Sequence, residues 1–413
     1  MHAVWANSKA LEMAGVTKDS TLPSGGVIEK DPETGELTGQ LFELPAMGLV
    51  MKEIPLWNRD QKRTAIKTAM RELNALGVTS ITEPGLGPGG SGYQGGLMDA
   101  ECISAYNDLY NQDELTVRVN ILLLCGEYGE LSFSDIEESL PFIGIHSGFG
   151  NEWLKVGGVK VFADGIPTVK TSWMYDEYIG GGHGSLVFPG DTDEDRCREL
   201  MNIIQYAHNH RFQLGIHAVG DRTIDACVEG FMKAMKEDPW DAHHYLIHAD
   251  FISDETMKRV ARHRIGVATQ SEVMSAVTDQ LHDVLAKEKI AQQIPLKEMV
   301  DAGIHISQGT DAPCMYPNWK ETFQAAVLRE SKVTGEVIGP EQRITPLEAI
   351  RMFTIEGAWL DHMDHMKGSI EVDKLADFCV LDEDILRVDP HRIKEIKTVM
   401  TIVGGNEGGQ VCS

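Results

Sequence analysis

The feature that most constrains the fold is a repeated alternation between short apolar runs and stretches with helical spacing. The runs are rich in β-branched residues and bounded by Gly or Asp, which is typical of buried strands. They lie at 77–82, 117–124, 154–162, 213–219, 245–249, 265–269 and 303–309. Helices are predicted between them at 59–76, 193–210, 221–236, 253–263 and 295–302. Because parallel strands need crossover connections, this alternation predicts a parallel sheet covered by helices.

Two parallel architectures, a doubly wound sheet and a barrel, fit this alternation. A dinucleotide-binding doubly wound sheet would carry G-x-G-x-x-G after a strand, and none of the predicted strands is followed by that motif. Ionisable residues at the ends of several strands favour the barrel. The seven strand units are one fewer than such a barrel needs. We therefore predict an α/β fold, a (β/α)8 TIM-type barrel that lacks its first strand.

The segments that flank the barrel units have a different character. Residues 7–58 contain the turn signals P-S-G-G and D-P-E-T-G and are predicted as a β-rich insertion. After a predicted helix at 346–360, the expected elements are strands at 369–372, 376–381 and 398–403 and a closing turn at 404–409. The predicted domains are a barrel over 1–365 and a small C-terminal β-sandwich module over 366–413.

The chain is strongly acidic, and this charge restricts its partners. Its 37 Lys and Arg stand against 63 Asp and Glu, a formal net charge of −26, which repels phosphate backbones and anionic lipids. We expect neither a nucleic-acid nor a membrane partner, since the apolar runs are also far shorter than the ~20 residues that cross a bilayer. Seven Cys without a C-x-x-C pair, and no signal-peptide pattern in the first residues, predict a reducing, cytoplasmic location.

Four predicted strands carry an ionisable residue in an otherwise apolar context, and these residues are the candidate metal ligands. They are Lys160 in V-K-V-F-A-D-G, His217 in G-I-H-A-V-G-D, His248 in I-H-A-D and Asp311 in G-T-D-A-P. His217 and His248 are 31 residues apart, one strand-helix unit, and Asp311 follows His248 by 63 residues, two units. Each alone is more often a wall or turn residue, but together at one end of a barrel they are costly to bury unless paired or bound to metal. Imidazole and carboxylate ligands suit zinc or a similar ion.

The Gly-rich loop 165–190 offers further candidates. Trp173 and Tyr178 could receive an apolar or aromatic part of a substrate, or could simply pack a long loop. His183, in G-G-G-H-G-S, could reach a substrate from the same loop. Surface positions are expected for the other paired histidines, His208, His210, His362 and His365.

These strings resemble the amidohydrolase superfamily, in its formamide-deformylase-like branch, amidohydrolase family 3. The string G-S-I-E-V-D-K-L-A-D-F-C-V-L-D near the end and H-A-V-W-A-N-S-K-A-L-E-M-A-G-V at the start extend the resemblance over essentially the whole chain. It implies a metal centre at the mouth of a (β/α)8 barrel, with a small β-sandwich beside it. The H-x-H pair of the family's first strand has no counterpart in this sequence. We expect that strand to precede residue 1, to have been lost naturally, or to come from a partner chain.

The resemblance also implies a role for each candidate ligand. His217 and His248 would bind a divalent metal, with zinc the expected ion. Lys160 would take up carbon dioxide to become a bridging carbamate, and Asp311 would serve as a ligand and proton shuttle. The implied reaction is metal-dependent hydrolysis of a C–N bond, in which metal-activated water attacks the carbonyl of a small N-substituted amide. Cyclic amides, carbamates and esters remain open as substrates.

Without the H-x-H pair, a catalytically degenerate barrel that acts as a binding or assembly subunit is the alternative. A sheet one strand short would also expose an edge beside 77–82 and another beside 303–309. Unpaired edges favour association. The chain is therefore expected to form a homo-oligomer or to bind a partner chain that supplies the missing strand.

Overall fold

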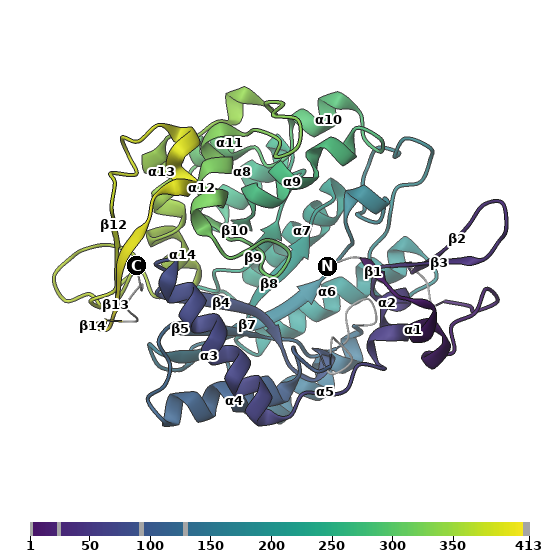
Figure 1. The fold of residues 1–413 in the computed structure, drawn as a ribbon, viewed down its shortest axis with the longest axis horizontal. Coiled ribbons are helices and arrows are strands. Elements are labelled where there is room, and N and C mark those ends of the chain that lie inside the picture. Colours follow the sequence, from purple (N-terminus) through teal and green to yellow (C-terminus); the bar gives the residue numbers. More distant parts are fainter. Residues whose placement is uncertain (1–2, 23–25, 91–94, 127–130, 408–413) are drawn as a thin grey trace.

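A curled parallel sheet forms the centre of the computed structural model (Figure 1), which describes residues 3–22, 26–90, 95–126 and 131–407. Seven strands follow the order β11-β10-β9-β8-β7-β5-β4. They are β4 (Ser80–Leu86), β5 (Arg118–Leu123), β7 (Leu154–Phe162), β8 (Gln213–Ala218), β9 (Tyr245–His248), β10 (Gly266–Thr269) and β11 (Ile306–Gln308). The short β6 (Phe149–Gly150) pairs antiparallel with β7. The predicted strands and the barrel-like α/β fold are confirmed.

Helices cover the outer face of this sheet (Figure 1). The helices from residue 59 onward are α3 (Arg59–Ala75), α4 (Ala100–Asn111), α5 (Phe133–Ile143), α6 (Asp193–Asn209), α7 (Asp221–Glu237), α8 (Asp254–Arg262), α9 (Ser271–Leu281), α10 (Lys287–Ala291), α11 (Leu296–Asp301), α12 (Trp319–Leu328), α13 (Pro346–Met352) and α14 (Ile355–Leu360), of which α14 lies at one end of the sheet. A capping box at Thr192 starts α6, because its hydroxyl accepts from the N–H of Asp195. The single helix predicted over 346–360 is wrong: it breaks into α13 and α14 at Thr354, whose φ of −127° and ψ of −95° are not helical.

Helix α14 closes the end of the sheet at which the strands begin. A buried cluster on the inner face joins it to the strands: Leu122, Tyr245, Ile247, Trp359 and Leu360. The Gln213 side-chain amide at the start of β8 donates to the main-chain oxygen of Leu360 at 2.8 Å. Because this end is filled, the opposite end, where the parallel strands finish, is the place for a site.

The sheet has two edges within the described residues, β4 and β11, and the barrel is open between them. Thr82 and Pro84 of β4 are exposed along this edge. The predicted association through these edges stays a prediction. Within the described part of the chain, every helix is too short or too polar to cross a lipid bilayer.

The N-terminal segment forms a small antiparallel sheet beside the end of the barrel at which the strands finish (Figure 1). Its order is β1-β3-β2, with β1 (Ala3–Trp5), β2 (Val27–Lys30) and β3 (Leu37–Phe42), and it carries α1 (Ser8–Met13) and α2 (Leu44–Met51). Thr171 of the loop after β7 donates to Glu43 at 2.7 Å. The predicted β-rich insertion therefore also contains helices and touches the loop that carries the substrate candidates.

The C-terminal segment forms one antiparallel sheet, β12-β13-β14, on the opposite side of the molecule (Figure 1). Its strands are β12 (Phe378–Leu381), β13 (Thr398–Val403) and β14 (Asn406–Glu407). The strand predicted at 369–372 is wrong, because Ile370 and Val372 are 85% and 89% exposed and pair with nothing described. The predicted turn at 404–409 begins as expected at Gly404, but Asn406–Glu407 already belong to a strand and 408–409 lie outside the described residues.

This module is tied to the barrel by buried polar contacts. Arg118 of β5 donates to both carboxylate oxygens of Asp377, at 2.7 and 3.0 Å, and Thr401 donates to the main-chain oxygen of Asn74 in α3 at 2.6 Å. Among the described residues the module is a single three-stranded sheet, and the predicted β-sandwich module stays a prediction. The domain boundaries at 365 and 366 stay a prediction.

Candidate active site

Lys160 lies near the end of β7 and is buried, with 3% of its surface exposed. Its ammonium sits 4.3 Å from the centre of the Phe162 ring, two residues along the same face of the strand. Burial lowers the pKa of Lys160 to about 7, and the charge of Asp311 acts in the opposite direction. A substantial fraction of this lysine is therefore the neutral amine at neutral pH.

His217 and His248 meet at the ends of the adjacent strands β8 and β9. Their ring centres are 4.6 Å apart, with the planes at 73°. In a regular strand His248, which pairs with Ala218, would point away from His217. The strand ends at His248, which has a φ of +76°, and this left-handed conformation allows the two rings to meet.

Asp164, two residues beyond β7, contacts His217 from the side of helix α7. Its Oδ1 lies 3.2 Å from Nδ1 of His217, and both side chains are buried. Burial raises the pKa of Asp164 to about 7, while its hydrogen bonds from the backbone and from Thr223 act to lower it. Asp164 lies within the string V-K-V-F-A-D-G, and no role was predicted for it from the sequence. An acidic residue directly after a buried strand was the available signal.

Asp311 lies in a tight turn just after β11, which is the edge strand at one side of the sheet. Its φ is +55°, and its main-chain oxygen accepts from the N–H of Cys314 at 2.7 Å. Burial raises the pKa of Asp250 to about 6, and the charge of Asp311 adds to this shift to a smaller extent. The side-chain amide of Gln293 donates to Asp250 at 2.7 Å and acts to lower the pKa. Asp311 thus acts electrostatically on Lys160 and on Asp250, a second acidic residue for which no role was predicted from the sequence.

The three substrate candidates lie in different environments. Trp173 and Tyr178 are buried, with Trp173 under the Arg222 guanidinium at 4.0 Å and the Tyr178 hydroxyl donating to the main-chain oxygen of Ser172 at 2.8 Å. Both rings therefore pack the loop. His183 is exposed, and its Nε2 is 3.9 Å from a carboxylate oxygen of Glu177. Substrate contact by these three residues stays a prediction.

The donor set at the strand ends fits a divalent metal ion. Two imidazoles in contact provide nitrogen ligands, and Asp164 supplies the carboxylate that often orients a metal-bound histidine. Among the described residues, a group of three potential metal ligands with ligand atoms close together lies at the other end of the barrel. There, Asp241, His243 and His362 bring ligand atoms within 4.8 Å of one another.

That second group is better explained as an aromatic stack than as a metal site. His243 lies parallel to His362, with ring centres 3.9 Å apart at 9°, and stacks on Trp359 at 3.6 Å. His305 covers the other face of Trp359 at 3.8 Å. An imidazole binds a metal in its own ring plane, so two parallel rings at this separation cannot both bind one ion at ~2.1 Å.

The predicted surface positions of His208 and His362 are wrong. His362 is part of the stack, and His208 is fully buried with its Nδ1 2.8 Å from Nε2 of His244. Both histidines are placed by packing partners that are distant in sequence. His362 follows helix α14, which closes the end of the barrel, and His208 faces the segment that leads into β9.

The stack predicts that stability falls in acid. Burial, followed by the neighbouring His362, lowers the pKa of His243 to about 4; the other ionisable groups that face it are Asp241, His244 and Arg264. Unfolded His243 binds a proton between pH 6.5 and 4 whereas the folded one does not, so the free energy of unfolding decreases as the pH falls through this window, by about 3 kcal/mol from this group. Urea unfolding from pH 7 to 4.5 measures this slope.

The matched variant is His243→Asn. Asn tolerates the φ of +45° at this position and keeps a donor for the main-chain oxygen of Trp359, but does not titrate. It should flatten the slope, whereas His146→Asn at an exposed position should leave it unchanged. An equal slope in His243→Asn and wild type would contradict the assignment.

The barrel-like sheet, with two histidines in contact at the ends of neighbouring strands, is the arrangement expected of a metal-dependent hydrolase of the barrel type. The profile described as the amidohydrolase family matches residues 1–407, and the chain belongs to that family. It is 26% identical over 408 residues to YtcJ of Bacillus subtilis (strain 168), covering 98% of this chain and 72% of YtcJ. The N-substituted formamide deformylase of Arthrobacter pascens is 26% identical over 420 residues, covering 98% of this chain and 71% of the deformylase.

A solved structure shows the same fold. The metal-dependent hydrolase from Pyrococcus horikoshii OT3 superposes with a TM-score of 0.71 at 21% identity, over 94% of this chain and 71% of that one. These matches confirm the predicted family and the hydrolase class.

Proposed function

We propose that the chain hydrolyses the C–N bond of a small N-substituted amide at the cluster formed by Lys160, His217, His248 and Asp311. The observation that carries the proposal is the contact between His217 and His248, with ring centres 4.6 Å apart at the ends of neighbouring strands. The similarity to an N-substituted formamide deformylase supports the substrate class.

The two imidazoles, with Asp311 as a further ligand, would hold a divalent cation, for which zinc is the best fit. When bound, such an ion supplies Lewis acidity that polarises a carbonyl and acidifies water. Lys160 adds a further ligand if its neutral amine bonds to carbon dioxide and releases a proton, leaving a carbamate. The lowered pKa of this buried amine favours that reaction.

Asp311 is the proton carrier in this proposal. Its carboxylate accepts a proton from the attacking water and delivers it to the leaving nitrogen as the C–N bond breaks, so that an acid and an amine are released. Asp311 is half-buried, and its charge acts on the buried amine of Lys160, so the two groups lie within electrostatic reach of each other.

A binding or assembly subunit is the second candidate, and one observation favours it. Among the described residues, the strand ends contribute only these two histidines in contact, and the sheet keeps two unpaired edges. A barrel of this kind would bind a partner through its edges without turnover.

Zinc binding and turnover separate the two candidates. The 413-residue chain should bind zinc in a chelator competition and release amine from at least one member of a panel of N-substituted formamides and acetamides. His217→Gln and His248→Gln should each weaken zinc binding by at least ~10-fold because each removes a ligand, whereas His391→Gln, at an exposed histidine, should not. A wild-type chain that binds no zinc and hydrolyses no amide would contradict the enzyme proposal.

A further inference from the structure

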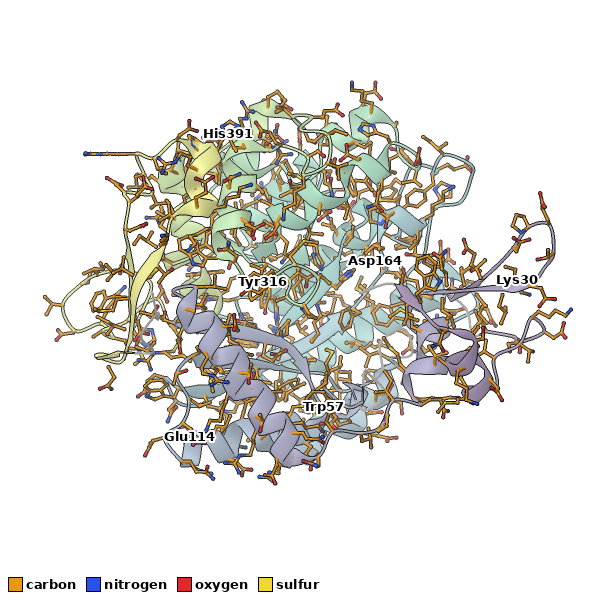
Figure 2. All side chains as sticks on the ribbon, in the orientation of Figure 1. Lys30, Trp57, Glu114, Asp164, Tyr316 and His391 are labelled. Atoms are coloured by element: carbon orange, nitrogen blue, oxygen red, sulfur yellow. The ribbon has the colours of Figure 1, made fainter. Side chains whose placement is uncertain are left out.

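We propose that Gly309 and Gln270 form the subsite that receives the N-substituent of the amide, and that glycine at position 309 leaves the room for this substituent. The proposal rests on the proposed function and deepens it, because it names the part of the substrate that determines specificity. The strand ends lie in the interior of the molecule, where Figure 2 labels Asp164 after β7. Gly309 directly follows β11 at these ends and precedes Asp311 by two residues.

The backbone at Gly309 does not itself require glycine. Its φ lies outside the left-handed region, so other residues could adopt the same conformation. A Cβ built at this position would lie 3.9 Å from Nε2 of Gln270, an ordinary van der Waals distance, and apart from the chain neighbours no other described atom is within 4 Å. Glycine beside a strand marks a bulge, a bend or the close approach of another backbone or a ligand. The register of β11 with β10 is regular and the space beside Gly309 is open, which favours a ligand.

A side chain at position 309 would face the inside of the barrel. Two residues earlier, the Oγ of Ser307 lies 3.4 Å from the position of a Cβ on Gly357, in the helix α14 that closes the barrel. Because side chains alternate along a strand, position 309 lies on the same side as Ser307. On the neighbouring strand, Ala268 packs against the inner-face cluster and pairs with Ser307, so Gln270 comes level with Gly309 on that side.

Gln270 is held in place beside this position. Its side chain is 6% exposed, and its Nε2 donates to the main-chain oxygen of Ala268 at 3.1 Å. The N–H of Gly309 donates to the main-chain oxygen of Thr269 at 3.0 Å, so the two segments stay paired beyond the ends of their strands. Positions held by strands keep their geometry more precisely than positions on loops. Gln270 and Gly309 therefore form a fixed wall against which a bound group can lie.

The position of Asp311 indicates which part of the substrate lies against this wall. The proposed function places the nitrogen of the C–N bond beside Asp311, and the N-substituent is bonded to that nitrogen. Since Gly309 is two residues from Asp311, the substituent extends into the room beside Gly309 and Gln270. A change of one methylene in a substrate pocket alters specificity by about 10–200-fold, so an added side chain at 309 should be felt by a large substituent.

Gly309→Ala and Gly309→Val test the proposal with two amides that share one acyl group and carry either an N-methyl or an N-cyclohexyl substituent. We expect Gly309→Ala to lower kcat/KM for the N-cyclohexyl amide by at least ~10-fold and to leave the N-methyl amide within about 3-fold of wild type. Gly309→Val should enlarge this difference, because its side chain fills more of the same room. Folding should be retained, since the new Cβ makes only an ordinary contact with Gln270.

Gly48→Ala is the matched control. The φ of Gly48, in α2 of the N-terminal segment, also lies outside the left-handed region, and a Cβ there would meet no described atom within 4 Å. This variant should leave the ratio of the two kcat/KM values unchanged. A second pair of amides, with one N-substituent and either a formyl or a propionyl group, shows which side of the substrate is affected. Gly309→Ala should leave the ratio for this acyl pair within about 3-fold of wild type.

Several outcomes would overturn the proposal. An unchanged ratio for the two N-substituents in Gly309→Ala, equal losses for both amides, or an effect confined to the acyl pair would each do so. A Gly309→Ala chain that does not fold would also overturn it, because the backbone would then require glycine. So would a wild type that accepts the N-methyl but not the N-cyclohexyl amide, since the room would be unused. A wild type that hydrolyses no amide would contradict the proposed function itself, which distinguishes that failure from the others.

Discussion

Asp311→Asn is expected to reduce amide turnover by ~10²–10⁴-fold when it is compared with wild type at equal zinc content. The substitution removes the proton acceptor but preserves the size and an oxygen that can still face a cation. Folding should be retained, because Asn tolerates the φ of +55° and the turn depends on the main-chain oxygen of residue 311, which accepts from Cys314. The two histidines that would bind the ion are unchanged.

The comparison requires turnover and zinc content measured on the same preparations. Asp373→Asn is the matched control, since Asp373 also has a positive φ, +69°, but is exposed and lies in the C-terminal region away from the strand ends. It should leave turnover unchanged. If Asp311→Asn turns over near the wild-type rate at equal zinc content, Asp311 is a turn residue and another group moves the proton.

Asp361→Asn is expected to lower the free energy of unfolding by about 3 kcal/mol at pH 7, because it removes a buried charge that balances two half-buried lysines. The Asp361 carboxylate accepts from Thr82 and Asn120 at 2.9 Å each and pairs with Lys367 at 2.6 Å. Lys155 donates to its main-chain oxygen, and burial lowers the pKa of this lysine to about 8 while Asp361 opposes that shift. Asp361 thereby joins β4, β5 and β7 to the segment after α14.

Urea unfolding at pH 7 measures this loss, and Glu371→Gln provides the control. Glu371 forms an ion pair with Lys374 at 3.6 Å, but its side chain is 64% exposed, so the change should stay within about 0.5 kcal/mol. A similarly small effect in Asp361→Asn would mean that the lysines find other partners and that this network does not hold the edge strand β4 in place.

The parallel sheet and the candidate ligands could be predicted because their signals are local. A buried strand between two helices is an apolar run with turn residues at its ends, and this pattern needs no knowledge of the partner strand. Lys160, His217, His248 and Asp311 were found for the same reason, since an ionisable residue at the end of such a run is conspicuous. Their common end of the sheet then follows from parallel topology.

The elements that were missed depend on contacts between distant segments. Whether 369–372 forms a strand depends on the presence of a pairing partner, and Ile370 has none among the described residues. His362 looks like a solvated helix residue until α14 enters the barrel and places it against His243. Likewise, the contacts of Asp164 could not be predicted from the sequence, because β8 and α7 bring His217 and hydrogen-bond donors to its two carboxylate oxygens only in the folded chain.

The sequence by itself thus determined the alternation of strands and helices, the acidic charge and the four ionisable residues at strand ends, because each is written in residues that are neighbours along the chain. Only the tertiary structure decided which of those residues touch, how α14 fills one end of the barrel, and which nitrogen of His217 faces Asp164. These features depend on hydrogen bonds and ring contacts between segments tens to hundreds of residues apart, such as Lys155 with Asp361, and periodicity carries no information about them.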